Sequence, residues 1–184
     1  MNLTTSVNSK IQGSVRCPGD KSISQRVLMI GALMNQAMKI DGFLHGADPL
    51  STMSALNQIG AKITIGEDGL VYLHKRDRAF LDSKDFLDLG NSGTGLRLML
   101  GLTAGIGLNL SFCGDKSLSK RPMGRVINPM IKMGANIESL NGKLPISLSS
   151  AKLLTKFSYE LPIASAQVKS SILLAGLAAK SEIQ

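Results

Sequence analysis

The chain has 184 residues with a hydrophobic fraction of 43%, enough for a sizeable core, which excludes a globally disordered protein. Its formal net charge of +8 favours anionic partners, but the chain has no block of five basic residues and only 4% aromatic residues, which argues against nucleic acid. Because neither a membrane span nor a signal-peptide pattern is found, we expect Cys17 and Cys113 to be reduced thiols of a cytoplasmic protein.

The first candidate site follows a strand-like apolar run, residues 11–17, which ends at a Pro-Gly pair. Residues 20–26 then hold two cations, two serines and an aspartate ahead of another apolar run, so we expect a strand, a turn and a helix start. A helix start offers free N–H groups and the positive end of the helix dipole. Lys21, Ser22 and Arg26 therefore predict a phosphate or carboxylate site, although a capped helix with solvated cations fits the same residues.

The next elements place one helix between short strands. Residues 38–43 predict a strand, and an Asp-Pro pair at 48–49 opens a helix that Gly60 ends. Two apolar runs, 61–65 and 70–73, flank the turn Gly-Glu-Asp-Gly and predict a β-hairpin.

The same order of elements then begins again. An apolar run at 86–89 leads through the polar turn 90–95 into a helix, and residues 108–113 predict the next strand. Pro122 opens a further helix, and residues 135–148 predict a second hairpin around an Asn-Gly pair.

Matches between residues indicate a repeat. The matched pairs are Ser22 with Ser92 at an offset of 70, Gly42 with Gly114 at 72, and residues 60–63 with 134–137 at 74, and a third start at 165–177 lies 73 residues after Ser92. The predicted unit is strand, helix, strand, helix, strand, strand (βαβαββ). Because such a unit buries its apolar helix face only against its siblings, we expect an α/β fold of repeated units around a pseudo-threefold axis, with the third unit incomplete. We therefore expect the chain to be part of a longer protein.

A second polar loop, residues 114–123, adds a candidate cation. Arg121 stands beside Pro122, whose ring fixes the backbone at a predicted helix start. The planar fork of an arginine suits a carboxylate or phosphate, so Arg121 is a candidate anion ligand, with a solvated arginine as the alternative. Around a threefold axis, the three polar helix starts would converge on one cavity.

Four motifs together resemble the enolpyruvyl transferase family, and they cover the whole chain in order. They are Pro-Gly-Asp-Lys-Ser-Ile-Ser-Gln-Arg at 18–26, Gly-Asn-Ser-Gly-Thr-Gly-Leu-Arg at 90–97, the loop at 114–125 with its Arg-Pro-Met-Gly-Arg, and Ala-Ser-Ala-Gln-Val-Lys-Ser at 164–170. Family members that act on UDP-N-acetylglucosamine normally carry a reactive cysteine in the loop ahead of Arg-Pro. Here Cys113 lies before that loop, so the resemblance favours the aromatic-pathway branch.

The resemblance implies the enolpyruvyl transferase fold, with two domains of three βαβαββ units and the substrates between them. Residues 1–18 would be a strand and hinge that pack with the second domain, and residues 19–184 would form the substrate-binding domain. The implied reaction transfers the enolpyruvyl group of phosphoenolpyruvate to the 5-hydroxyl of shikimate 3-phosphate and releases phosphate, as a step of chorismate and aromatic amino-acid biosynthesis. The resemblance implies no metal, no organic cofactor, no nucleic acid and no membrane, and a monomer when the protein is complete.

The resemblance also assigns site residues. Lys21 would contact both substrates and is the candidate catalytic residue. The implied ligands of shikimate 3-phosphate are Lys21, Ser22, Arg26, Ser165 and Gln167, and those of phosphoenolpyruvate are Lys21, Asn91, Gly93, Thr94, Arg121 and Gln167. The acid–base carboxylates would lie beyond Gln184, so the 184-residue chain alone is expected to be inactive.

One departure and two alternatives remain. Many relatives have Ser-Ser-Gln at the third helix start, whereas this chain has Ser-Ala-Gln at residues 165–167, so one hydroxyl is missing. A relative acting on UDP-N-acetylglucosamine is one alternative to the implied function. A basic repeat module that binds nucleic acid without chemistry is the other.

Overall fold

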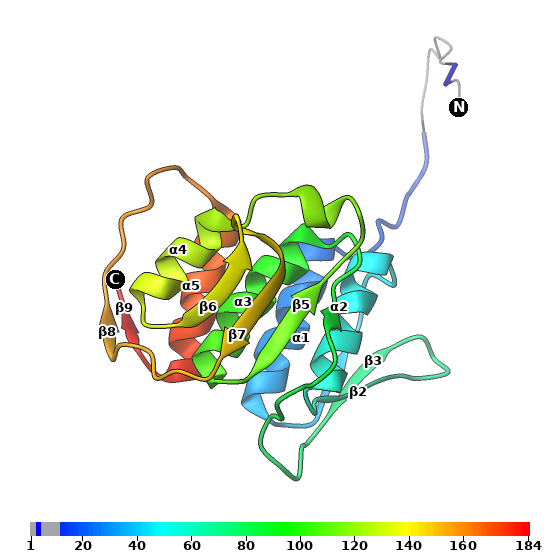
Figure 1. The fold of residues 1–184 in the computed structure, drawn as a ribbon. Coiled ribbons are helices and arrows are strands. Elements are labelled where there is room, and N and C mark those ends of the chain that lie inside the picture. The colour runs from blue at the N-terminus through cyan, green and yellow to red at the C-terminus, as the bar shows by residue number, and fades with distance from the viewer. Residues whose placement is uncertain (1–2, 5–11) are drawn as a thin grey trace.

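The computed structural model describes residues 3–4 and 12–184, and its elements follow the predicted repeat (Figure 1). The first unit holds α1 (Lys21–Met34), β1 (Met38–Ile40), α2 (Ala47–Gln58), β2 (Lys62–Ile65) and β3 (Val71–His74). The second holds β4 (Leu87–Asp88), α3 (Gly93–Ile106), β5 (Leu110–Cys113), a 3₁₀ turn η1 (Leu118–Lys120), α4 (Gly124–Lys132), β6 (Asn136–Leu140) and β7 (Lys143–Ser149). The third holds β8 (Lys156–Phe157), α5 (Ala166–Ala179) and β9 (Glu182–Ile183).

Each unit has its own small sheet. In the first, β3 lies between β1 and β2 and is antiparallel to both. The second has the order β4-β5-β7-β6, with β4 parallel to β5 and the hairpin β6–β7 antiparallel, and the third pairs β8 with β9 in parallel. The second unit therefore shows the whole βαβαββ order, and both predicted hairpins are confirmed.

The strand predicted at residues 11–17 is wrong for the part that the structure describes. Residues 12–17 form no strand, and Ile11 lies outside the described residues. This segment leads away from the body of the fold, and within residues 12–184 β1 pairs only with β3 (Figure 1). An apolar run becomes a strand only where a neighbouring strand can share its hydrogen bonds, and the described residues offer none here.

The three core helices fix the register of the repeat. Each has 14 residues, and each ends in a left-handed C-cap: Asn35 for α1, Gly107 for α3 and Lys180 for α5. Their N-caps, Asp20, Ser92 and Ser165, are 72 and 73 residues apart, so the pairing of Ser22 with Ser92 at an offset of 70 is wrong by two positions. The identity misled because Ser22 lies inside the first turn of its helix, whereas Ser92 is a cap.

In the corrected register, the first two residues of each core helix occupy equivalent positions. The first residues of the helices are Lys21, Gly93 and Ala166, and the second residues are Ser22, Thr94 and Gln167. Each unit therefore contributes a different side chain at the same place, which is how a repeat of one fold builds an asymmetric site.

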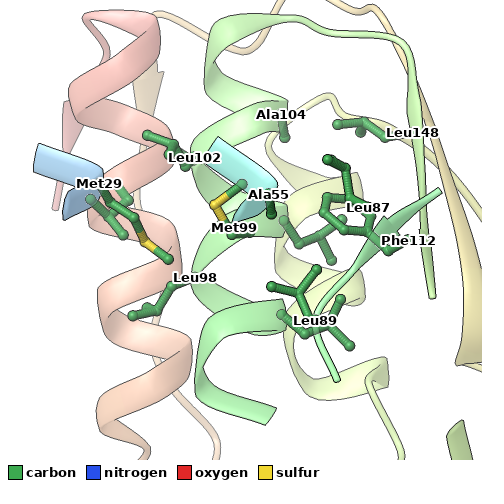
Figure 2. Packing of buried hydrophobic residues seen from close by; sticks show 14 of the residues in the cluster. Met29, Ala55, Leu87, Leu89, Leu98, Met99, Leu102, Ala104, Phe112 and Leu148 are labelled. Carbon is green, nitrogen blue, oxygen red and sulfur yellow. The ribbon is translucent and has the colours of Figure 1, made fainter. Parts of the chain in front are cut away.

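Helix α3 is the centre of the core. Ten of its residues are buried, and it contacts α1, α2, α4 and α5. Figure 2 shows Leu98 and Leu102 pointing toward α5, while Leu89 and Phe112 reach the same core from the strand side. Two glycines bring α3 and α5 close together, since a Cβ added at Gly101 would lie only 2.2 Å from the Ser171 carbonyl oxygen.

One apolar stripe of α5 stays uncovered. Leu28 and Leu100, at equivalent positions of α1 and α3, are buried, whereas Leu173 of α5 is 48% exposed. Leu177, one turn further along α5, is 56% exposed. In the first two units a second helix, α2 or α4, follows the core helix, and the described part of the third unit has no such helix.

One other expectation, the helix start at Pro122, differs from the structure. Helix α4 begins at Gly124 and not at Pro122, because the first carbonyl to accept helical hydrogen bonds is that of Met123, from the N–H groups of Val126 and Ile127 at 3.0 Å. Cys17 is exposed, whereas Cys113 at the end of β5 is partly buried. Among the described helices, none is long and apolar enough to cross a membrane.

We predict that Gly101→Ala destabilises the chain because the new methyl group would press on the α5 backbone, which cannot move aside without repacking. The expected loss is about 1–3 kcal/mol of unfolding free energy, measured by denaturant unfolding. Gly124→Ala, in a helix position with open space around it, is the control and should change stability by no more than about 0.5 kcal/mol. Equal losses in both variants would contradict the proposed close packing.

Candidate active site

The starts of the three core helices line one cavity. Its volume is about 350 Å³, and its walls are Lys21, Asp48, Asn91, Gly93, Thr94, Arg97, Arg121 and Gln167. Six of these were predicted from the sequence, and Asp48 and Arg97 were not. Ser22, Arg26 and Ser165, the other predicted residues, lie at the starts of α1 and α5 but do not line this cavity.

The start of α1 presents Lys21 to the cavity. The Asp20 carboxylate caps the helix by accepting the Ile23 N–H at 2.7 Å. Lys21 Nζ lies 2.9 Å from Asp48 Oδ2 in the first turn of α2. Half of the Lys21 side chain is exposed, so this ion pair is modest and an incoming anion can compete for the ammonium group.

The start of α3 brings two guanidinium groups over a glycine. Arg97 Nη1 donates to the Gly93 carbonyl at 3.0 Å, and Arg121 donates to the Asn91 side-chain oxygen. A Cβ added at Gly93 would lie 2.9 Å from Arg97 Nη1 and 3.0 Å from Arg121 Nη1. A methyl group at this position would therefore displace the ends of both arginine side chains from the helix start.

Positive charge dominates this side of the cavity. Burial lowers the pKa of Arg97 below its usual value, and the nearby charges of Arg121 and Arg125 push it the same way. An arginine still stays protonated at neutral pH. Arg97 has no ion-pair partner among the described residues, so the cluster favours an anion with several charges.

The start of α5 joins the other two. Gln167 Nε2 donates to Thr94 Oγ1 at 2.8 Å, which links the second residue of α5 to the second residue of α3. Arg26 Nη2 donates to Ser170 Oγ at 2.9 Å, which links α1 to α5. The Ser165 hydroxyl caps α5 by accepting the Val168 N–H. Ser165 and Arg26 therefore both belong to the side of the site where α1 meets α5. Ala166, the residue after Ser165, has no hydroxyl to add there.

Two further chemistries find little support. Among the described residues, no group of three His, Cys, Asp or Glu side chains could hold a metal ion. Burial raises the pKa of the Cys113 thiol, and the Asp88 carboxylate adds to the rise, so this thiol is a poor nucleophile at neutral pH.

Comparison with known proteins identifies the family. The family model described as EPSP synthase (3-phosphoshikimate 1-carboxyvinyltransferase) matches residues 6–184. The chain belongs to the EPSP synthase family.

Relatives of this chain carry the same name. A 3-phosphoshikimate 1-carboxyvinyltransferase of Ruthia magnifica is 49% identical over 95% of this chain and 40% of the relative. Its counterpart in Novosphingobium aromaticivorans is 46% identical over 92% and 39%. A solved EPSP synthase of Acinetobacter baumannii superposes with a TM-score of 0.84 at 40% identity, over 91% of this chain and 38% of that structure. The predicted family and fold are confirmed, and the chain spans about 40% of the length of these relatives.

Sequence reasoning missed Asp48 and Arg97, although a signal existed for each. Asp48 stands at a predicted helix start, and Arg97 lies one helical turn after Gly93 and so on the same face of α3. Nothing in the sequence alone places Asp48 beside Lys21, because the two residues belong to different helices.

We predict that inorganic phosphate stabilises this chain through the cavity. A ligand at ten times its dissociation constant adds about 1.4 kcal/mol of stability, so phosphate should raise the Tm, and less so at high salt. Arg121→Gln should remove most of the rise, whereas Lys152→Gln, an equal charge change on an exposed residue away from the cavity, should keep it. A rise that survives Arg121→Gln would place the anion elsewhere.

Proposed function

We propose that this chain forms one wall of the active site of a synthase that joins phosphoenolpyruvate to shikimate 3-phosphate. In the proposed reaction the 5-hydroxyl of shikimate 3-phosphate loses its proton as its oxygen bonds to C2 of phosphoenolpyruvate, and C3 gains a proton, which gives a tetrahedral adduct. C3 then gives up a proton as phosphate leaves C2, and the double bond between C2 and C3 is restored. The observation that carries the proposal is the convergence of three helix starts with Lys21, Arg97 and Arg121 on one cavity. Relatives named 3-phosphoshikimate 1-carboxyvinyltransferase support the same reaction.

The charges of the substrates fit this wall. Both substrates carry phosphate, and phosphoenolpyruvate also carries a carboxylate, so the adduct between them collects several negative charges in a small volume. Preorganised cations and helix N–H groups stabilise such a species at little reorganisation cost. We assign to Lys21, which lines the cavity and pairs with Asp48, the role of offsetting charge on both substrates.

We assign the two substrates to two sides of the site. Ser22, Arg26, Ser165 and Gln167 would bind shikimate 3-phosphate on the α1–α5 side. Asn91, Gly93, Thr94 and Arg121 would bind phosphoenolpyruvate at the start of α3, where Gly93 lets a ligand approach the backbone without a Cβ. Arg97, which lines the same cavity, joins this second group.

Proton transfer needs groups that this wall does not offer. The single carboxylate lining the cavity is Asp48, and it is paired with Lys21. We therefore propose that the acid–base carboxylates come from a second domain that faces the cavity. We also propose that residues 1–18 act as the strand and hinge toward that domain, which would supply the pairing partner that residues 12–17 lack here. The proposal includes a cytoplasmic enzyme that works as a monomer without metal or organic cofactor.

We predict that the 184-residue chain binds shikimate 3-phosphate and releases no phosphate when both substrates are added. Positioned acid–base groups contribute about 10²- to 10⁴-fold, and an open cavity weakens every ion pair in it. Calorimetric titration measures the binding and a phosphate assay the turnover. Lys21→Ala should weaken binding about tenfold or more, whereas Lys62→Ala, at an exposed ion pair outside the cavity, should leave it unchanged.

Two results would oppose this proposal. Absence of any shikimate 3-phosphate binding by the unmodified chain would remove the assigned substrate. Rapid phosphate release by the chain alone would show that the facing domain is not required.

We also predict that Gly93→Ala acts on one substrate more than on the other. The added methyl group would displace Arg97 and Arg121, which the proposal assigns to phosphoenolpyruvate. With residues 1–184 joined to the remaining part of the Ruthia magnifica relative, the KM for phosphoenolpyruvate should rise more than the KM for shikimate 3-phosphate. Equal increases in the two KM values would show that Gly93 has a structural role only.

A further inference from the structure

Gln25 is a fully buried amide that connects its own helix to two others, α2 and α3. It lies in α1, and none of its surface is exposed. Its Nε2 group lies 2.7 Å from Ser92 Oγ, 2.9 Å from Thr52 Oγ1 and 3.2 Å from the Asp48 carbonyl oxygen. One side chain of the first unit therefore contacts the start of α2 and the cap of α3.

Each of these acceptors is connected to the candidate active site. The carboxylate of Asp48 holds Lys21, and the Thr52 hydroxyl donates to the Asp48 carbonyl at 3.0 Å. The Ser92 hydroxyl caps α3 by accepting the Gly95 N–H at 3.0 Å, and Ser92 stands between Asn91 and Gly93 in the chain. The amide thus sets where the start of α3 lies relative to the Asp48–Lys21 pair.

The orientation of the amide carries a cost. The Gln25 Oε1 atom is buried and has no hydrogen-bond partner among the described residues. Turning the amide over would place that oxygen against the Asp48 carbonyl, which can only accept. The observed orientation is the one in which the two N–H groups face the three acceptors. A buried acceptor left without a partner calls for a compensating role, and contact with both α2 and the cap of α3 is such a role.

The surroundings are shaped to hold this amide. A Cβ added at Gly95 would lie 2.7 Å from Ser92 Oγ, 2.8 Å from Thr52 Oγ1 and 2.9 Å from Gln25 Nε2. The residues at the equivalent third position of α1 and α5 are Ile23 and Val168, both with larger side chains. The glycine in α3 therefore makes room for the amide, and no other unit has this arrangement among the described residues.

We propose that Gln25 is a positioning residue, which holds the start of α3 against the Asp48–Lys21 pair and so sets the geometry in which substrate anions bind. This role rests on the proposed function. Gln25 itself does not line the cavity, so its effect reaches shikimate 3-phosphate through Asp48 and Lys21, the residue assigned to both substrates, and reaches phosphoenolpyruvate also through the Asn91–Thr94 segment.

The test compares two buried threonines that differ in one contact. Thr52 and Thr103 are both fully buried in helices, and each hydroxyl donates to the carbonyl four residues earlier, at 3.0 and 2.8 Å. Thr52 also accepts from Gln25. Thr52→Val and Thr103→Val therefore remove the same local hydrogen bond, and Thr52→Val alone disturbs the amide.

The measurement is the dissociation constant of shikimate 3-phosphate for the 184-residue chain, determined by titration alongside the Tm of each variant. Gln25→Met, which keeps the side-chain length and removes the donor, should raise the constant about tenfold, and Thr52→Val should raise it about threefold. Thr103→Val should lower the Tm and leave the constant unchanged.

The outcomes separate this inference from the proposed function. Failure of the unmodified chain to bind shikimate 3-phosphate removes the proposed function and this inference with it. Normal binding by the unmodified chain together with unchanged binding by Gln25→Met overturns the positioning role alone. If Gln25→Met does not fold, the threonine pair decides, and equal dissociation constants for Thr52→Val and Thr103→Val overturn the role.

Discussion

The close contact between α3 and α5 is the constraint on which the site depends. Backbones approach this closely only where side chains are absent, and Gly101 and Gly105 provide that on α3. Because the two helices have the same length and equivalent caps, a close parallel contact also brings their N-termini together. The hydrogen bond from Gln167 to Thr94 is the result, and it closes one side of the cavity.

The cavity carries positive charge that carboxylates of the described residues neutralise only in part. Arg97 and Arg121 converge over Gly93, and Lys21 faces them from α1 with Asp48 as its partner. Clustered cations repel one another, which is the cost of preparing the site before the ligand arrives. An anionic ligand relieves this repulsion, so binding energy and site geometry come from the same residues.

Local signals in the sequence predicted most of the fold. Both hairpins follow from turn residues between apolar runs, and the polar starts of α1, α3 and α5 follow from cap residues. The strand at residues 11–17 failed because its pattern needs a pairing partner that no local signal supplies. The two-residue error in the repeat arose because matching serines occupied different places in their helices, and only cap geometry distinguishes them.

The site residues that lie in a sequence motif could be predicted. The contacts that join residues of different units could not. Lys21, Asn91 and Gln167 stand in motifs at helix starts, and the structure brings them to one cavity. Gln25 stands in a motif as well, yet its importance depends on Thr52 and Ser92, which come from other helices. Contacts between units require the packing of α1, α2 and α3, which periodicity and composition do not specify.

The most direct test of this account is a crystal structure of the chain with shikimate 3-phosphate. We expect the ligand at the shared starts of α1 and α5, with its phosphate within hydrogen-bonding distance of the Ser165 hydroxyl and its ring facing Lys21. A ligand bound away from these helix starts, with the cavity left to solvent, would contradict the claim that the three starts form one substrate site.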